Sequence, residues 1–214
     1  MDLKLVIFDC DGVLVDTEVL FNQALVDDLN KHGLSLTLAQ CMGLFVGGTI
    51  PNVKSEAEKL GAVLPETWVE DFYTNVYKPL GEHTEPIAGI TGTLDAIEHA
   101  GIPYCVASNG RIQKMEITLG RTGMLERFKD VMFSAQELET AKPAPDLFLA
   151  AAAAFGVLPS ECVVIEDSLT GVLAAKRAQM KCYGYVPDGD GKVLAAEQAI
   201  LFDDMAQLPA LLGI

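Results

Sequence analysis

The stretch LKLVIFDCDGVLVDTE, residues 3–18, decides the fold. Its four consecutive apolar residues, 5–8, are typical of a strand buried on both faces, as in a parallel sheet. Asp9 and Asp11 follow at the sheet edge where ligands of open α/β folds bind. Because two neighbouring carboxylates repel each other, they indicate a hard cation such as Mg²⁺. Gly12 permits a sharp turn there, although an Asp-Gly pair also occurs in turns that have no metal.

The composition narrows the class of protein. Half of the 214 residues are apolar, which allows a sizeable core. A net charge of −15 predicts that the chain binds neither nucleic acid nor an anionic membrane. The sequence contains five scattered cysteines and no C-x-x-C pair, which favours reduced, buried thiols in a cytoplasmic protein. No stretch resembles a membrane span or a signal peptide. The oligomeric state stays open, and a monomer is compatible with the sequence.

Apolar strand-like runs and amphipathic helices alternate over most of the chain. Strands are predicted at residues 5–8, 103–107, 131–133, 162–165, 181–186 and 200–202. Helices are predicted at residues 18–31, 52–60, 66–77, 89–100, 112–121, 147–155, 169–178 and 205–212. We therefore predict an α/β fold with a doubly wound parallel sheet, a Rossmann-like core. Residues 1–16 and 85–214 would form this core, and residues 17–84, which show no strand pattern, an inserted all-helical cap domain.

Three of the predicted strands end in polar residues. These residues are Asp9 and Asp11, Ser108 and Asn109, and Glu166 and Asp167. The carboxyl ends of parallel strands share one edge, so four carboxylates would meet there, and a divalent cation would offset their repulsion. Lys142 would add the one fixed positive charge. Taken singly, each cluster is also typical of a helix entry, with Ser168 as a plausible helix N-cap.

Four motifs in this order resemble the haloacid dehalogenase-like hydrolases, in the group of β-phosphoglucomutase and phosphoglycolate phosphatase. The motifs are DCDGVLVDTE at 9–18, SNG at 108–110, KPAPD at 142–146 and VIEDSLTG at 164–171. The resemblance implies a Mg²⁺-dependent phosphatase that acts on a small phosphorylated metabolite, a sugar or sugar-acid phosphate. The predicted helical insertion matches the cap domain of that family.

The resemblance also implies a role for each matching residue. Asp9 would be the nucleophile that forms an aspartyl-phosphate, and Asp11 the general acid and base. Mg²⁺ would be bound by Asp9, the main-chain carbonyl of Asp11 and Asp167, with Glu166 in or near the ligand set. Phosphate contacts would come from Gly12, Ser108, Asn109 and Lys142, with Gly12 and Asp16 at the hinge to the cap. Apart from the resemblance, Arg111 and Lys114 on the core side are available for a substrate carboxylate or hydroxyl. Arg111 and Lys114 are equally compatible with ordinary solvated charges.

Three other functions stay open at this point. A β-phosphoglucomutase-like enzyme would need cap cations for a second phosphate. The positions aligned with the His, Lys and Arg of those mutases are Phe21, Val46 and Ile50, all apolar. A haloacid dehalogenase needs no metal and no second aspartate, so Asp11 argues against it. A receiver-like signalling module keeps its acyl-phosphate and has no cap, so the insertion favours turnover.

Overall fold

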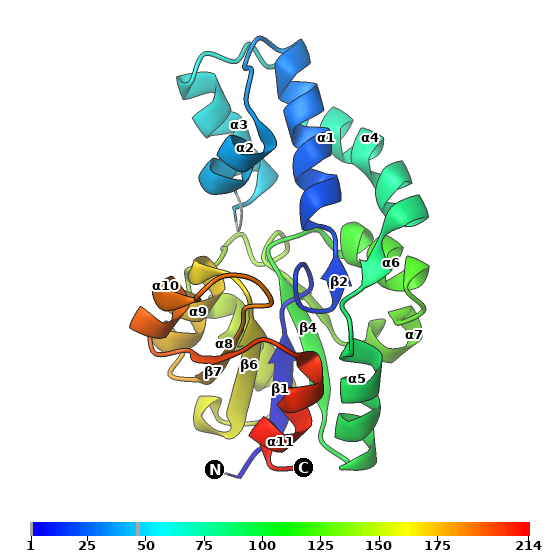
Figure 1. Cartoon of the computed structure of the whole chain (residues 1–214), viewed down its shortest axis with the longest axis vertical. Helices are drawn as coiled ribbons and strands as arrows, with labels where there is room; N and C mark the ends of the chain where they lie inside the picture. The colour runs from blue at the N-terminus through cyan, green and yellow to red at the C-terminus, as the bar shows by residue number, and fades with distance from the viewer. Residues whose placement is uncertain (1, 46–47) are drawn as a thin grey trace.

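The computed structural model describes residues 2–45 and 48–214 of the chain. In this part the main sheet has six parallel strands in the order β5-β4-β1-β6-β7-β8. Their bounds are Met132–Ser134 (β5), Tyr104–Ser108 (β4), Leu5–Phe8 (β1), Cys162–Glu166 (β6), Lys181–Tyr185 (β7) and Ile200–Phe202 (β8). Helices cover both faces of the sheet (Figure 1). The predicted α/β fold with a doubly wound parallel sheet is confirmed.

The strand β1 lies in the middle of the sheet and contributes side chains to two hydrophobic cores. Val6 and Phe8 pack into one core, and Leu5 and Ile7 pack into the core on the opposite face. All four side chains are fully buried, which explains the uninterrupted apolar run. β4 pairs with one edge of β1 and β6 with the other, so the winding reverses at β1. Ligands of open α/β sheets bind at this switch point, and Asp9 directly follows it.

The helices around the sheet bring polar loops to the carboxyl ends of the strands. They are Ile90–His99 (α5), Ile112–Arg121 (α6), Leu125–Phe128 (α7), Asp146–Ala154 (α8), Leu169–Arg177 (α9), Lys192–Ala196 (α10) and Leu208–Leu212 (α11), with 3-10 turns at Pro159–Glu161 and Met205–Gln207. Ser168 caps α9 as predicted, because its Oγ accepts a hydrogen bond from the N–H of Gly171 at 3.1 Å.

Four further helices form a separate layer beyond the carboxyl ends of the strands (Figure 1). Their bounds are Glu18–Lys31 (α1), Leu38–Phe45 (α2), Ile50–Lys59 (α3) and Trp68–His83 (α4). They enclose a hydrophobic core of their own, in which Trp68 stacks on Phe72 and donates a hydrogen bond from Nε1 to Asp28 at 2.6 Å. The inserted all-helical cap is thereby confirmed, and the limits 17–84 stay a prediction.

The cap helices differ from the predicted ones in number and in bounds. α2 was not predicted. α3 begins at Ile50 rather than at residue 52, because the Oγ1 of Thr49 accepts a hydrogen bond from the N–H of Asn52. α4 continues past residue 77 to His83 although it contains Pro79, and it keeps the fully buried Leu80 in the cap core.

A short antiparallel ribbon lies where the chain leaves the sheet and returns to it. It pairs Val15–Asp16 (β2) with Glu85–Pro86 (β3) and was not predicted, because two-residue strands carry no periodic signal. Within residues 17–84 the described part of the chain contains no strand, as predicted. The ribbon ties the two ends of the helical insertion together beside the site.

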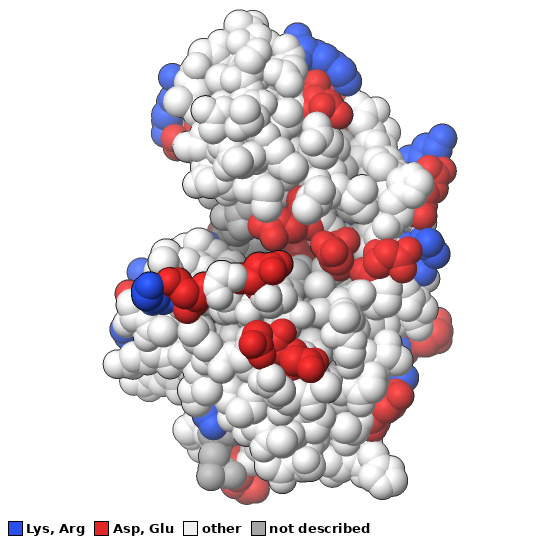
Figure 2. Space-filling model, in the orientation of Figure 1, with Lys and Arg blue, Asp and Glu red and all other residues white. Residues whose placement is uncertain are grey.

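All five cysteines of the sequence are free and buried, as predicted. Of the helices in the described residues, none is both long and apolar enough to cross a membrane. Acidic side chains gather along the waist between the sheet and the cap helices on the face shown in Figure 2. An anionic ligand that approaches this face therefore needs local positive charge at its binding site.

Candidate active site

Asp9 lies at the centre of the site and is bonded to Lys142. The Nζ of Lys142 donates to Asp9 Oδ1 at 2.5 Å and to Glu166 Oε1 at 2.6 Å. The three residues come from the end of β1, the loop before α8 and the end of β6, and all are buried. Burial alone would lower the pKa of Lys142, but the two carboxylates outweigh it and raise that pKa. The ammonium group therefore stays charged.

Glu166 is held on every side by donors from the protein. Its Oε2 accepts hydrogen bonds from the N–H of Asp167 at 3.0 Å, the N–H of Ser168 at 2.9 Å and the Oγ of Ser168 at 2.8 Å. Its carboxylate rests directly against Gly171, where an added Cβ would lie 1.7 Å from Oε1. Gly171 is thus needed for this arrangement. Gly171 was not predicted as a site residue, although its place in the VIEDSLTG motif was a signal.

Asp167 lies beside Asp9 and points across Gly12. A Cβ at Gly12 would lie 1.9 Å from Asp167 Oδ2, and its φ of +80° also favours glycine. Within residues 2–45 and 48–214, no hydrogen-bond donor or cation pairs with the Asp167 carboxylate. This group is therefore available to a ligand that brings positive charge.

Three carboxylates are close enough to share one cation. Oxygens of Asp9, Glu166 and Asp167 all lie within 4.8 Å of one another. Burial raises the pKa of Asp9 to about 7 and that of Asp167 well above its usual value; neighbouring carboxylates add to both shifts and Lys142 opposes them. The cluster thus carries more negative charge than Lys142 compensates. An oxygen-only donor set of this kind fits a hard divalent cation such as Mg²⁺.

Asp11 points toward α6 and the cap and is held by two donors. Its Oδ1 accepts a hydrogen bond from Lys114 Nζ at 2.6 Å and another from the Oγ1 of Thr17. The Lys114 ammonium also lies 4.4 Å from the ring centroid of Phe21 in α1. Burial would raise the pKa of Asp11, but Lys114 and Thr17 outweigh it and hold that pKa below its usual value. Lys114 thus connects Asp11 with the cap.

The two polar residues after β4 occupy different places. The Oγ of Ser108 is buried at the cavity floor and accepts a hydrogen bond from the N–H of Gly110 at 3.0 Å. The side chain of Asn109 turns to the neighbouring loop, where its Oδ1 accepts from the N–H of Lys142 at 2.9 Å. The amide of Asn109 therefore positions the loop that carries Lys142.

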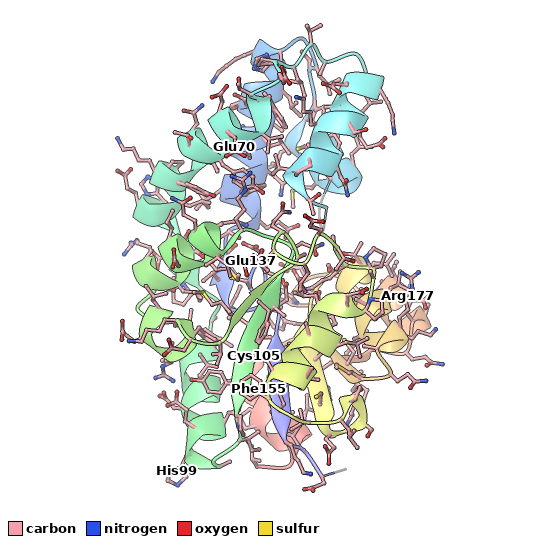
Figure 3. All side chains as sticks on the ribbon, turned by 180° about the vertical axis from the view of Figure 1, so that it is seen from behind. Glu70, His99, Cys105, Glu137, Phe155 and Arg177 are labelled. Carbon is pink, nitrogen blue, oxygen red and sulfur yellow. The ribbon has the colours of Figure 1, made fainter. Side chains whose placement is uncertain are left out.

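Arg111 is turned toward the cap rather than toward Asp9. Its guanidinium group forms a two-pronged ion pair with Glu70 on α4, with one contact at 2.7 Å, and lies 4.0 Å from the ring centroid of Tyr73. Figure 3 shows Glu70 on this helix. Arg111 does not line the cavity described next. Its present contacts are those of a tie between α6 and α4.

A cavity between the sheet and the cap helices brings most of the predicted site residues together. Those that line it are Asp9, Asp11, Gly12, Ser108, Asn109, Lys114, Lys142, Glu166 and Asp167. The cap contributes a largely apolar wall that includes Phe21 and Ile50, two of the three positions that the sequence analysis aligns with the polar cap residues of the mutases. Val46, the third, lies outside the described residues. The cavity has the form of a small-molecule site with a charged floor and an apolar roof.

A Rossmann-like parallel sheet, a helical cap and a floor of carboxylates at the carboxyl ends of the strands indicate an enzyme that acts on a small ligand. The family model described as haloacid dehalogenase-like hydrolase matches residues 6–185. The chain belongs to the haloacid dehalogenase-like hydrolases, as its motifs predicted.

Relatives and solved structures agree with this assignment. The chain is 31% identical over 211 residues to the 6-phosphogluconate phosphatase of Escherichia coli K12, covering 98% of this chain and 94% of that protein. It is 29% identical over 180 residues to hexitol phosphatase B of the same organism, covering 82% and 80%. A family hydrolase of Deinococcus radiodurans R1, solved with bound phosphate and sodium, has a TM-score of 0.78 at 30% identity and covers 99% and 96%. The two named relatives are phosphoric monoester hydrolases.

Proposed function

We propose that the protein is a Mg²⁺-dependent phosphatase that hydrolyses a small phosphorylated metabolite, a sugar or sugar-acid phosphate, through an aspartyl-phosphate at Asp9. The observation that carries this proposal is the position of Asp9, bonded to Lys142 and beside Asp167 on the floor of a capped cavity. The activities in the names of the two E. coli relatives support the substrate class. A cytoplasmic location belongs to the same proposal.

In the first step a carboxylate oxygen of Asp9 attacks phosphorus, and the bond from phosphorus to the ester oxygen breaks. The leaving oxygen takes a proton from Asp11 and departs as an alcohol. Lys142 offsets negative charge on the transferring group from its fixed place beside Asp9. Forming an acyl-phosphate divides one difficult displacement into two easier ones.

In the second step Asp11 accepts a proton from the water that attacks phosphorus. Inorganic phosphate leaves and the Asp9 carboxylate is restored. Lys114 and Thr17 lower the pKa of Asp11 in this structure, which favours the ionised form that accepts this proton. The proton taken up here is the one that Asp11 gives to the leaving oxygen in the next turnover. The cap helices limit access of bulk water to the acyl-phosphate.

Asp9, Asp167 and the main-chain carbonyl of Asp11 would bind the Mg²⁺ ion. When bound, the ion would offset charge on the carboxylates and on the transferring phosphoryl group. Glu166 already accepts hydrogen bonds on both oxygens, which supports a place for it behind the direct ligands. From there it would hold Lys142 and the turn into α9.

Hydrolysis is favoured over phosphoryl transfer between two positions of a sugar. A mutase has to hold a second phosphate in the cap, yet Phe21 and Ile50 line the cavity with apolar side chains. The metal-free dehalogenase chemistry has no use for Asp11. A signalling receiver would keep the acyl-phosphate intact and has no cap.

The test is an assay for released phosphate, first with p-nitrophenyl phosphate and then with a panel of phosphorylated metabolites. We expect net hydrolysis and no conversion of β-glucose 1-phosphate to glucose 6-phosphate, even when the bisphosphate is supplied. A coupled dehydrogenase assay measures the second reaction. Isomerisation faster than phosphate release would contradict this proposal and show that the protein is a mutase.

A further inference from the structure

The cavity wall beyond the reaction centre offers no free positive charge among the described residues. Five carboxylates and two ammonium groups line the cavity in this part of the chain. Both ammonium groups, those of Lys114 and Lys142, are paired with carboxylates at the floor. Arg111 is held by Glu70 outside the cavity. A substrate that carries a second anionic group would therefore find no cation to receive it.

Glu18 is a carboxylate that lines the cavity outside the cluster of Asp9, Glu166 and Asp167. It is the first residue of α1, is half-buried, and lines both the cavity and the neighbouring hollow that opens toward α10. It lines the same cavity as Asp167 and as Asp11, the proposed proton donor to the leaving group. No donor or cation among the described residues pairs with its side chain. A partly desolvated carboxylate of this kind is stabilised by a hydrogen-bond donor from a ligand.

We propose that Glu18 determines specificity by accepting a hydrogen bond from a hydroxyl group of the substrate and rejecting a carboxylate, so that the enzyme prefers phosphate monoesters of uncharged polyols. This inference rests on the proposed function and narrows its substrate class. A hydroxyl-to-carboxylate hydrogen bond is charge-assisted and stronger than a neutral one. Two carboxylates at the same place, with no cation between them, repel each other. Discrimination arises from this repulsion as much as from the attraction.

The remaining cap wall suits the same kind of leaving group. Asn22 and Thr49 add polar residues to the cavity lining, while Phe21, Tyr73 and Val53 present apolar surface. Aromatic and aliphatic walls pack against the C–H faces of a polyol, and a few polar groups orient its hydroxyls. None of these side chains carries a positive charge that would favour an acid.

Pairs of substrates that differ only in one terminal group provide the test. Glycerol 3-phosphate and 3-phosphoglycerate differ by CH₂OH against COO⁻, and glucitol 6-phosphate and 6-phosphogluconate differ in the same way. We expect the wild-type kcat/KM to be at least about tenfold higher for the alcohol of each pair. The acid of the second pair, 6-phosphogluconate, appears in the name of the E. coli relative. This pair is therefore the stricter test of a preference for the alcohol.

The variant Glu18→Gln keeps the shape of the side chain and removes its charge. We expect it to narrow the alcohol-to-acid ratio of kcat/KM severalfold, mainly by improving the acid. Glu58→Gln is the matched control. Glu58 is exposed on α3 and lies outside the cavity, and its substitution changes the net charge by the same amount as Glu18→Gln. This control should leave the alcohol-to-acid ratio of kcat/KM unchanged for both substrate pairs.

Binding of the same four compounds to Asp9→Asn, with and without Glu18→Gln, separates this inference from the proposed function. Isothermal titration in Mg²⁺ gives each Kd without turnover. A Kd that favours the alcohols, lost with Glu18→Gln, supports the inference even if the wild type hydrolyses none of the compounds. Equal or tighter binding of the acids overturns it even if hydrolysis is fast. If Glu18→Gln leaves the ratio of the alcohol Kd to the acid Kd unchanged, the inference is also overturned.

Discussion

Replacing Asp9 with Asn is expected to reduce phosphate release on the order of 10⁴-fold or more while the protein stays folded. The amide cannot attack phosphorus, and the second half of the reaction then has no acyl-phosphate to hydrolyse. In the metal-free protein the variant should melt at the same temperature as the wild type or higher. The pKa of Asp9 is raised to about 7, so its ionisation opposes folding as the pH rises from the usual range of a carboxyl toward 7, and Asn removes that cost.

The measurements are steady-state phosphate release and thermal unfolding followed by circular dichroism above pH 7. Asp130→Asn is the matched control, because Asp130 is exposed and does not line the cavity. It should keep wild-type activity. Asp9→Ala guards against activity that returns when the introduced amide deamidates to the carboxylate. Near-normal turnover in Asp9→Ala would rule out nucleophilic catalysis by this residue.

Removing divalent cations should lower the rate of hydrolysis at least about a hundredfold, and added Mg²⁺ should restore it. Asp9 and Asp167 lie in a cluster of carboxylates whose negative charge exceeds the single positive charge of Lys142. A divalent cation would offset the excess. Several kcal/mol of charge stabilisation would be lost with the ion, and each 1.36 kcal/mol is a factor of ten in rate. The assay compares enzyme dialysed against EDTA with the same sample after addition of MgCl₂.

Binding of the ion has a readout that does not need turnover. Mg²⁺ should raise the melting temperature of the wild type, because a ligand that binds only the folded state stabilises it. Asp167→Asn should shift this effect to higher Mg²⁺ concentration, and Asp130→Asn should not. Full activity after exhaustive chelation would contradict the proposed site and favour the metal-free chemistry of the dehalogenases.

The central part of this fold was predictable because its signals are local and repeated. The apolar run of β1 followed by Asp9, and the similar ends of β4 and β6, each indicate a buried strand that leads into a polar loop. Parallel pairing then places those ends at one edge, and the structure brings them together as expected. The roles of the residues there stay predictions.

The cap was predicted less completely, because tertiary contacts decide its helices. In α2 the sequence LAQCMGLF has little polar face and contains a glycine, so it gave no helical period. Pro79 favoured an earlier end for α4, yet packing of that helix in the cap core and against α6 carries it to His83. Contacts of this kind override local propensity.

The partners of the basic residues were also beyond the reach of the sequence pattern. Arg111 pairs with Glu70, which is 41 residues away, and Lys114 pairs with Asp11, which is 103 residues away. Neither pair has a spacing that a helix or strand period would reveal. Both residues were predicted as substrate contacts or as ordinary solvated charges; in the structure Arg111 contacts the cap helix α4, and Lys114 is bonded to Asp11 in the cavity.

Trapping the covalent intermediate tests the central claim most directly. The enzyme is mixed with a radiolabelled phosphate monoester that it hydrolyses, quenched in acid during turnover, and digested for peptide sequencing by mass spectrometry. The account predicts protein-bound phosphate on Asp9 that is released by hydroxylamine, as an acyl-phosphate is, and no label in Asp9→Asn. Absence of bound phosphate during rapid turnover, or its presence on a different residue, would contradict the account.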